Sequence, residues 1–438
     1  MNKPWIPLNK EYNGNSYMDN LNSELNDLYE WLRPTEAENH LRKLTVLRYI
    51  TFIESVLPNS YVVLQGSSAT DTFLSDSDID LIIFLRENPS DPPANKIHNI
   101  EFNFQSLKHQ KHASAFKTEP LDHISILETI AREFRKSKMV NDIKIITTAR
   151  VPIIKTQDKH SHLDIDICVS NFDGVVLTNC LLSFLRSDFI NFSKEKDHRL
   201  KPTIDPNTLK KLIFILKIFI HLNQLESPFE GGFGSTEIVH FALFITMMHP
   251  GEDNLATLLL SFFELIGRQL NYFLCGLSIQ SNCPHFISKI SHSLLTNETP
   301  QSLIIQNWSD SSSFLGTKTK KTIQLSHLCN HALCILNNIT NNDLKNKNPG
   351  KSFKSLVSFI LPDLSSYIEI RNKQESIYRM LIECENTSTS QCCNQSSSAH
   401  RIFYPKFELD TKTTLLITNS TDSSQTLSGF AKIQQKFR

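Results

Sequence analysis

Apolar residues recur at helical spacing near the start of the chain. Four leucines between residues 20 and 32 share one face and predict a helix that Pro34 ends. Thr35, with Glu38 three residues later, forms a capping-box pattern and predicts a second helix that ends near Pro58. The apolar stripe expected on this second helix consists of Leu41, Leu44, Leu47 and Ile50.

Shorter apolar runs then predict a small α/β unit. They are rich in β-branched residues and too short for most helices. The expected strands are 61–65, 78–85, 143–147, 151–154 and 162–169, with a helix over 126–137. Residues 86–120 are polar, contain several prolines, and are predicted to be an inserted loop.

The rest of the chain returns to helical periodicity. Helices are expected over 210–222, 236–248 and 254–273, and Lys217 is a single charge among the apolar residues of the first. The last residues are rich in Ser, Thr, Asn and Gln and predict a flexible tail. The expected organisation is N-terminal helices (1–58), an α/β unit (59–174), a helical region (175–383) and the tail (384–438). The fold class is therefore α+β.

Composition and charge narrow the possible functions. The 438 residues carry 45 Lys and Arg against 45 Asp and Glu, so bulk positive charge does not attract nucleic acid to this chain. The 9 cysteines include no CxxC pair, which favours reduced thiols in a nuclear or cytosolic protein over a zinc site. No apolar run reaches the ~20 residues of a membrane-spanning helix, and no secretory signal is expected.

The most informative pattern joins a Gly-Ser step to a strand that begins with two carboxylates. Gly66 and Ser67 precede Asp78 with 10 residues between, and Asp80 shares a strand face with Asp78. Two like charges at the edge of an apolar strand need a compensating cation, and Mg²⁺ ions with oxygen ligands provide one. A pair of such ions clamps the attacking and leaving oxygens of an in-line phosphoryl transfer.

Two further features extend this pattern. A glycine lets the backbone approach a phosphate, and a Ser67 hydroxyl with nearby N–H groups can hold triphosphate oxygens. Asp164 and Asp166 share one face of the strand 162–169, and by pattern alone either completes the carboxylate cluster. The alternative is that these polar residues only cap helices and form turns. The chain has no GxxxxGK, so a P-loop is not the phosphate site.

At these residues the chain resembles the polymerase β-like nucleotidyltransferases and, within them, the Trf-type nuclear poly(A) RNA polymerases. GSSATDTFLSDSDIDLIIF (66–84) is similar to the family signature, and ARVPIIK (149–155) resembles the strand before the third family carboxylate. The segments 211–235 and 258–279 resemble a central-domain helix with its GGxxS turn and a further family helix. The resemblance implies a nucleotidyltransferase domain joined to an all-helical central, PAP-associated domain.

The resemblance also implies roles for individual residues. Asp78, Asp80 and Asp166 would bind Mg²⁺ or Mn²⁺, and Asp166 would also help to deprotonate an RNA 3′-OH. The residues that would bind the nucleotide are Gly66, Ser67, Ser77, Asn179, Lys217, Ser235 and Thr236. For Lys217 the alternative to a triphosphate contact is a lysine that extends its charge to the helix edge.

Two positions depart from the family pattern. Thr236 stands where the family has a tyrosine that stacks on the base, and such stacking is worth about 1–3 kcal/mol. Phe233 is a candidate substitute for that tyrosine. In the segment 306–316 the family's polar base-reading pair is missing, which leaves base selectivity open. Three lysines follow this segment: Lys318, Lys320 and Lys321. They are candidates for phosphate contacts, and the alternative is that they belong to a solvated loop.

The implied activity is template-independent addition of AMP from ATP to RNA 3′ ends in nuclear RNA surveillance, in the nucleoplasm or nucleolus. The implied partners are an RNA 3′ end, a zinc-knuckle RNA-binding protein and an RNA helicase of a TRAMP-like complex, with no membrane. Two other functions stay open: a terminal uridylyltransferase on the same scaffold, and a catalytically weak scaffold paralogue in an RNA-decay complex.

Overall fold

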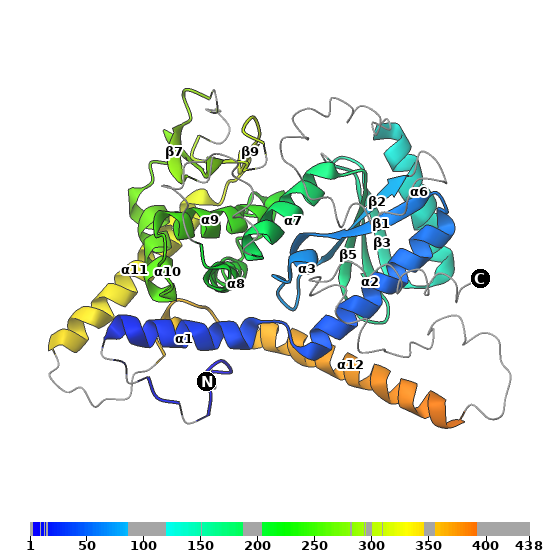
Figure 1. Ribbon diagram of the computed structural model, residues 1–438, viewed down its shortest axis with the longest axis horizontal. Coiled ribbons are helices and arrows are strands. Elements are labelled where there is room, and N and C mark those ends of the chain that lie inside the picture. The colour runs from blue at the N-terminus through cyan, green and yellow to red at the C-terminus, as the bar shows by residue number, and fades with distance from the viewer. Residues whose placement is uncertain are drawn as a thin grey trace. The chain divides into compact units, whose positions relative to one another are not determined.

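The computed structural model describes residues 3–85, 120–186, 204–345 and 355–391, except positions 9, 13, 15, 150, 281, 282, 293, 295–299 and 309 (Figure 1). Met1–Met380 form one compact unit and Leu381–Arg438 a second. The predicted loop lies outside the described residues except for its last position. The predicted tail is helical up to Gln391 and is otherwise outside them. The predicted domain boundaries stay a prediction.

The predicted N-terminal helices and strands are present with slightly shifted ends. The helices are α1 (Tyr17–Leu32) and α2 (Glu36–Val56), and Thr35 and Glu38 form the predicted capping box. The strands are β1 (Ser60–Gln65), β2 (Ile79–Leu85), β3 (Val140–Ile146), β4 (Ile153–Asp158) and β5 (Asp164–Val169). The helices among these strands are α3 (Gly66–Thr70), α6 (Pro120–Ser137) and α7 (Phe172–Leu185).

These strands form one mixed sheet in the order β1-β2-β5-β4-β3. β2 and β5 are parallel, and the other neighbours are antiparallel. The face that carries Asp80, Ile82 and Phe84 packs against Val175 of α7. Helices α2 and α6 pack against the other side (Figure 1). The predicted carboxylates therefore project from the face on which α7 lies.

The chain after residue 204 is built on a helical core. Its helices are α8 (Pro206–Leu222), α9 (Ser235–Met248), α10 (Leu255–Glu264), α11 (Thr322–Lys345) and α12 (Ser365–Gln391). Short helical turns are η3 (Pro228–Glu230), η4 (Leu265–Gln269) and η6 (Val357–Phe359). Helix α8 is buried almost all round, as its apolar run predicts. Helix α1 packs on α8 and α10, so it belongs to this core.

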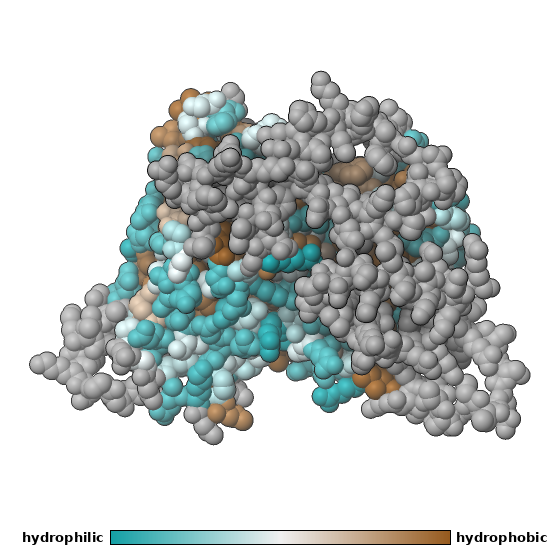
Figure 2. Space-filling model, in the orientation of Figure 1, coloured by the Kyte–Doolittle hydropathy of each residue, from teal (hydrophilic) through white to brown (hydrophobic). Residues whose placement is uncertain are grey.

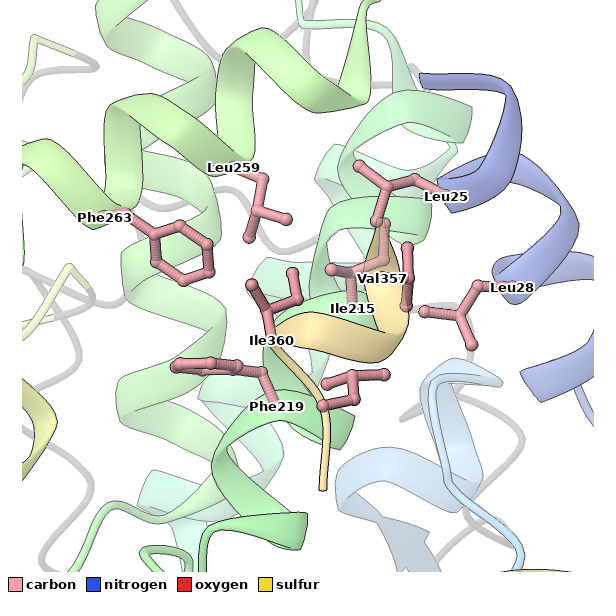
Figure 3. A pocket seen from close by; sticks show the side chains of 9 residues that line it. Leu25, Leu28, Ile215, Phe219, Leu259, Phe263, Val357 and Ile360 are labelled. Atoms are coloured by element: carbon pink, nitrogen blue, oxygen red, sulfur yellow. The ribbon is translucent and has the colours of Figure 1, made fainter. Parts of the chain in front are cut away.

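Figure 3 shows where α1, α8, α10 and η6 meet. Leu25, Phe219, Leu259 and Val357 are among the side chains that surround a void of about 10 Å³. Every lining residue is apolar, so the void offers no hydrogen-bond partner to a water molecule. We interpret it as a packing gap and not as a ligand site.

A second sheet corrects the prediction that the region after residue 175 is all-helical. Its strands, in spatial order, are β7 (His285–Ser288), β6 (Cys275–Ser278), β8 (Ile305–Gln306) and β9 (Phe314–Leu315). The predicted helix 254–273 ends early because Asn271 Oδ1 accepts hydrogen bonds from the N–H groups of Phe273 and Leu274. Such short strands leave too little pattern to detect. The fold class α+β is confirmed.

Most of the described surface in Figure 2 is hydrophilic, and hydrophobic atoms gather where Figure 1 places β7. Phe286 and Ile290, in and just after this strand, are 50% and 62% exposed. None of the described helices combines the length and the apolar composition that crossing a membrane would need.

Glu24 is a buried carboxylate that ties α1 to the chain before α12. It accepts hydrogen bonds from Trp5 Nε1 and Ser355 Oγ on Oε1. Its Oε2 accepts from the N–H groups of Leu356 and Val357 at 2.7 and 3.2 Å. Glu24 therefore supplies the acceptors that the first turn of η6 would otherwise lack.

Glu24→Gln keeps the size of this side chain but removes its charge and one acceptor. Because hydrogen bonds to buried charged groups are worth more than neutral ones, we expect a loss of about 2–4 kcal/mol in the free energy of unfolding, measured with urea. Glu30→Gln on the same helix is the control, since Glu30 is 55% exposed and should change stability by less than about 0.5 kcal/mol. Equal effects of the two substitutions would contradict the capping role of Glu24.

Candidate active site

Gly66 and Asp80 are in direct contact where β1 ends. Gly66 has a φ of +67°, a conformation that favours glycine. A Cβ added at this position would lie 2.4 Å from Asp80 Oδ2. Any larger residue would displace the carboxylate, so Asp80 itself requires the glycine of the Gly-Ser step.

Asp80 lies opposite Asp166 in the parallel pairing of β2 with β5. Asp78 comes directly before β2, and the Nζ atom of Lys155 on β4 lies 3.2 Å from Asp78 Oδ2 and 3.5 Å from Asp166 Oδ2. The structure therefore brings the three predicted carboxylates together. Asp164 is exposed and accepts a hydrogen bond from Gln157 at 3.1 Å, so it takes no part in this cluster.

Lys155 is a further residue of the cluster that the sequence patterns do not predict. Its place depends on the antiparallel register of β4 with β5, which pairs Lys155 with Asp166. The available signal is its position in the ARVPIIK segment, one strand before the acidic strand. The chain provides this ammonium group as a counter-charge for the carboxylates.

Burial and mutual repulsion change how the carboxylates titrate. Burial, together with the charges of Asp166 and Asp78, raises the pKa of Asp80 to about 7. Burial also raises the pKa of Asp166 to about 6, although Lys155 acts in the opposite direction. The ammonium groups of Lys155 and Lys217 both oppose the raised pKa of Asp80, but two positive charges do not neutralise three crowded carboxylates.

These residues fit a divalent cation. Their donor atoms are carboxylate oxygens, which Mg²⁺ prefers, and Asp166 Oδ1 is buried without a hydrogen-bond partner in the described part of the chain. Among the described residues no group of three or more Asp, Glu, His or Cys side chains already has metal-site spacing. Lys155 lies between Asp78 and Asp166, where a bound metal would take over its charge.

Ser67 and Asn179 lie on the two helices that adjoin Gly66. The N–H of Gly66 donates a hydrogen bond to Thr178 Oγ1 of α7 at 3.0 Å. Ser67 is buried in the first turn of α3, and Asn179 is half-buried beside Thr178. Both predicted nucleotide contacts are therefore on elements that meet at the glycine.

Ser77 shapes the loop before Asp78. Its Oγ accepts a hydrogen bond from the N–H of Leu74 at 2.9 Å. Arg42 of α2, which sequence analysis also misses, donates to the carbonyls of Leu74, Ser75 and Ser77 at 3.3, 3.2 and 2.5 Å. The predicted nucleotide contact of Ser77 stays a prediction, and in this structure its side chain closes a turn.

Lys217 is buried and does not extend to the helix edge. Its Nζ donates to the Thr72 carbonyl at 2.8 Å, and burial lowers its pKa to about 8 against the opposing charge of Asp80. One turn later, His221 Nε2 lies 3.0 Å from Asp76 Oδ2. This hydrogen bond is the main cause that raises the pKa of His221 to about 10. Helix α8 therefore directs two cationic side chains at the loop before Asp78.

Ser235 and Thr236 begin α9 and belong to a second group of predicted residues. Ser235 is exposed, and the carbonyl of Thr236 accepts a hydrogen bond from His240 Nδ1 at 2.8 Å. Phe233 is fully buried and lies edge-on to Phe241 with 5.8 Å between ring centroids. The idea that Phe233 stacks on a base is therefore wrong.

The segment 306–316 and the lysines after it adjoin this second group. Gln306 is 6% exposed and accepts a hydrogen bond from Ser278 at 2.7 Å. The N–H groups of Lys320 and Lys321 donate to the Gly231 carbonyl at 2.8 and 3.0 Å. The Nζ atom of Lys321 lies 3.2 Å from Glu230, whereas the side chains of Lys318 and Lys320 are exposed. Helix α8, which packs on both α7 and α9, joins this group to the carboxylates.

A hollow of about 200 Å³ adjoins the carboxylates. Asp80 and Asp166 line it together with the polar side chains of Gln65 and Asn171, and its other lining residues are Val151, Ile153 and Cys168. Asp80 and Asp166 therefore border a space that a ligand can enter.

Comparison with known proteins finds a matching family model and several similar poly(A) RNA polymerases. The model of the central palm domain of mitochondrial-like poly(A) RNA polymerases matches residues 21–186. Poly(A) RNA polymerase protein 2 of Saccharomyces cerevisiae is 24% identical over 318 residues, 70% of this chain and 46% of that protein. An inactive poly(A) RNA polymerase protein of Drosophila melanogaster is 25% identical over 293 residues, 64% of this chain and 60% of that protein. The chain thus spans less than half the length of the yeast relative.

Solved structures share the fold. The polymerase core of TRAMP, an RNA surveillance complex, has a TM-score of 0.62 at 20% identity over 83% of this chain and 100% of that one. A structure of the Cid1 poly(U) polymerase with MgGTP bound has a TM-score of 0.50 at 15% identity, over 72% of this chain and 94% of that one. Both likenesses concern the fold alone.

Asp80→Asn should stabilise the metal-free protein at high pH. The folded-state pKa of Asp80 is raised above its unfolded value, so ionisation destabilises the fold increasingly as pH rises from about 4 to about 7. At pH 8 in EDTA we expect the melting temperature to rise by about 2–8 °C, and the gain to disappear near pH 4. Asp164→Asn, which changes an exposed carboxylate, is the control. A gain that does not depend on pH would contradict the assigned titration.

Proposed function

Because this chain belongs to the Trf-type poly(A) RNA polymerase family within the polymerase β-like nucleotidyltransferases, we propose that it adds nucleotides to RNA 3′ ends without a template, with AMP from ATP as the unit. The observation that carries the proposal is the convergence of Asp78, Asp80 and Asp166 beside Gly66. Only the ammonium groups of Lys155 and Lys217 offset these three crowded carboxylates, and a purely structural cluster has no need of such an excess of negative charge.

In the proposed reaction the carboxylates bind the metal and accept a proton. Asp78, Asp80 and Asp166 would hold Mg²⁺ or Mn²⁺, which when bound supplies charge stabilisation to an in-line phosphoryl transfer. Asp166 accepts the proton of the RNA 3′-OH while the oxygen of that hydroxyl forms a bond to the α-phosphorus of ATP. The bond from that phosphorus to the bridging oxygen breaks, and pyrophosphate leaves.

Other residues orient the nucleotide. The backbone at Gly66 and the hydroxyl of Ser67 hold triphosphate oxygens, with Asn179 near the ribose and Ser235 at the phosphates. Lys217 adds positive charge beside Asp80, and a direct phosphate contact requires it to release the Thr72 carbonyl.

The proposal also includes a setting for the activity. We propose an RNA substrate in nuclear surveillance, delivered by a zinc-knuckle RNA-binding protein and an RNA helicase of a TRAMP-like complex. The formal charge of zero supports dependence on partners for RNA affinity. The likeness to the TRAMP polymerase core supports the same proposal.

A second candidate is a catalytically weak scaffold. Thr236 lacks an aromatic ring, and Phe233 is buried where it cannot replace one. The inactive Drosophila relative is a precedent for loss of activity in this family. Primer extension with each nucleotide offered separately distinguishes the candidates, because preferential UMP addition would replace the adenylyl assignment and no addition at all would favour the scaffold.

Asp166→Asn should lower RNA extension by at least about 10³-fold in Mg²⁺ and ATP, since it removes a metal ligand and the proton acceptor. Asp164→Asn is the matched control from the same strand face and should stay within about threefold of wild type. Both variants should keep the circular dichroism spectrum of the wild type. Loss of activity in Asp164→Asn with retention in Asp166→Asn would overturn the site assignment.

A further inference from the structure

Helix α12 contacts the loop before the carboxylates, and we propose that Tyr367 and Gln374 are positioning residues for Asp78 and Asp80. The proposal rests on the proposed function, because it concerns the geometry of the same site. Neither residue belongs to the predicted catalytic or nucleotide-binding set, and nearly 300 residues of sequence separate them from the loop.

The contacts converge on one residue, Ser75. The hydroxyl of Tyr367 accepts a hydrogen bond from the N–H of Ser75 at 3.1 Å and lies 3.1 Å from Ser75 Oγ. The side-chain amide of Gln374 donates to the Ser75 carbonyl. Ser75 is 2% exposed, Tyr367 0% and Gln374 6%, so water does not compete for these hydrogen bonds. Helix α12 therefore binds the N–H, the carbonyl and the hydroxyl of a single loop residue.

Ser75 is close enough to the carboxylates to control their position. It lies three residues before Asp78, inside the turn that the hydrogen bond from the N–H of Leu74 to Ser77 Oγ closes. Arg42 holds the same turn from α2. A shift of the turn is passed on directly to the start of β2, and a displacement of about 1 Å at a reacting group can cost about 10²-fold in rate.

A second set of contacts fixes α12 itself. Arg371, one turn after Tyr367, donates to Glu38 Oε1 at 3.0 Å and to Glu38 Oε2 at 3.1 Å. Glu38 also accepts a hydrogen bond from Ser75 Oγ at 2.6 Å, so it connects α12 to the loop a second time. Arg371 donates further to the carbonyls of Trp31, in the last turn of α1, and of Arg33, directly after it. Helix α12 is therefore bound both to Glu38 of α2 and to the end of α1, in addition to its contacts with Ser75.

The hydroxyl of Tyr367 can be separated from the packing of its ring. The ring lies 5.7 Å from that of Trp31, and Tyr367→Phe keeps this contact while it removes the bonds to Ser75. Gln374→Ala removes the remaining direct hydrogen bond from α12. Asn372→Ala is the matched control, since it removes an exposed side-chain amide from the same helix.

The test combines kinetics with hydrogen exchange on the full chain. For Tyr367→Phe with Gln374→Ala we expect kcat per folded molecule to fall at least about tenfold, with KM for ATP within about twofold of wild type. The Mg²⁺ concentration for half-maximal rate should rise at least about threefold, because the ligands are no longer held in place. Amide exchange should accelerate in peptides that cover residues 72–80. Asn372→Ala should match wild type in kcat, KM for ATP, Mg²⁺ dependence and amide exchange.

If the double variant has the kcat and the Mg²⁺ dependence of the wild type, the proposal is overturned, whatever the melting temperature of the variant. Ile360→Val, a substitution beside the apolar void, reports the effect of lower stability alone, and an equal loss of kcat in that variant would also overturn it. If the wild type transfers no nucleotide, the proposed function fails and the positioning claim is decided separately. Faster exchange over 72–80 with weaker Mn²⁺ binding would then support it, and unchanged exchange would overturn it.

Discussion

The parallel pairing of β2 with β5 is the contact on which the candidate site depends. It sets Asp80 opposite Asp166 on the sheet face that also carries the apolar cluster of Ile82, Phe84 and Cys168, and burial there raises the pKa of both carboxyl groups. A shift of one residue in this register would turn the carboxylates to the opposite face. The positive φ of Gly66 then allows β1 to end directly against Asp80. The fold thus concentrates negative charge where a cation and a triphosphate would meet.

A second constraint is the position of the loop between α3 and β2. Helices from distant parts of the chain hold it: α2 through Arg42, α8 through Lys217 and His221, and α12 through Tyr367. Most of these side chains form hydrogen bonds with backbone carbonyl or N–H groups of the loop. Those groups are present whatever residues the loop contains. The helical part of the molecule therefore contributes to the acidic site without supplying any of its carboxylates.

Local patterns were sufficient for part of this description. The capping box at Thr35 and the apolar run of α8 depend on neighbours in sequence, and both were predictable. The role of Lys155 depends on a strand register, and the second sheet consists of strands of four residues or fewer. Neither could be predicted from neighbours in sequence. On α2 the expected stripe is wrong, because Arg42 is buried by its bonds to the loop whereas Leu44 is only half-buried.

The most direct test of the carboxylate cluster is a crystal structure with Mn²⁺ and a non-hydrolysable ATP analogue, with the metal located by its anomalous signal. We expect a Mn²⁺ position about 2.1 Å from oxygens of Asp80 and Asp166, with Asp78 as a further ligand and the Lys155 ammonium displaced from between the carboxylates. Triphosphate density should lie against Gly66 and Ser67. An anomalous signal elsewhere, with Lys155 still between Asp78 and Asp166 while the nucleotide is bound, would contradict the account.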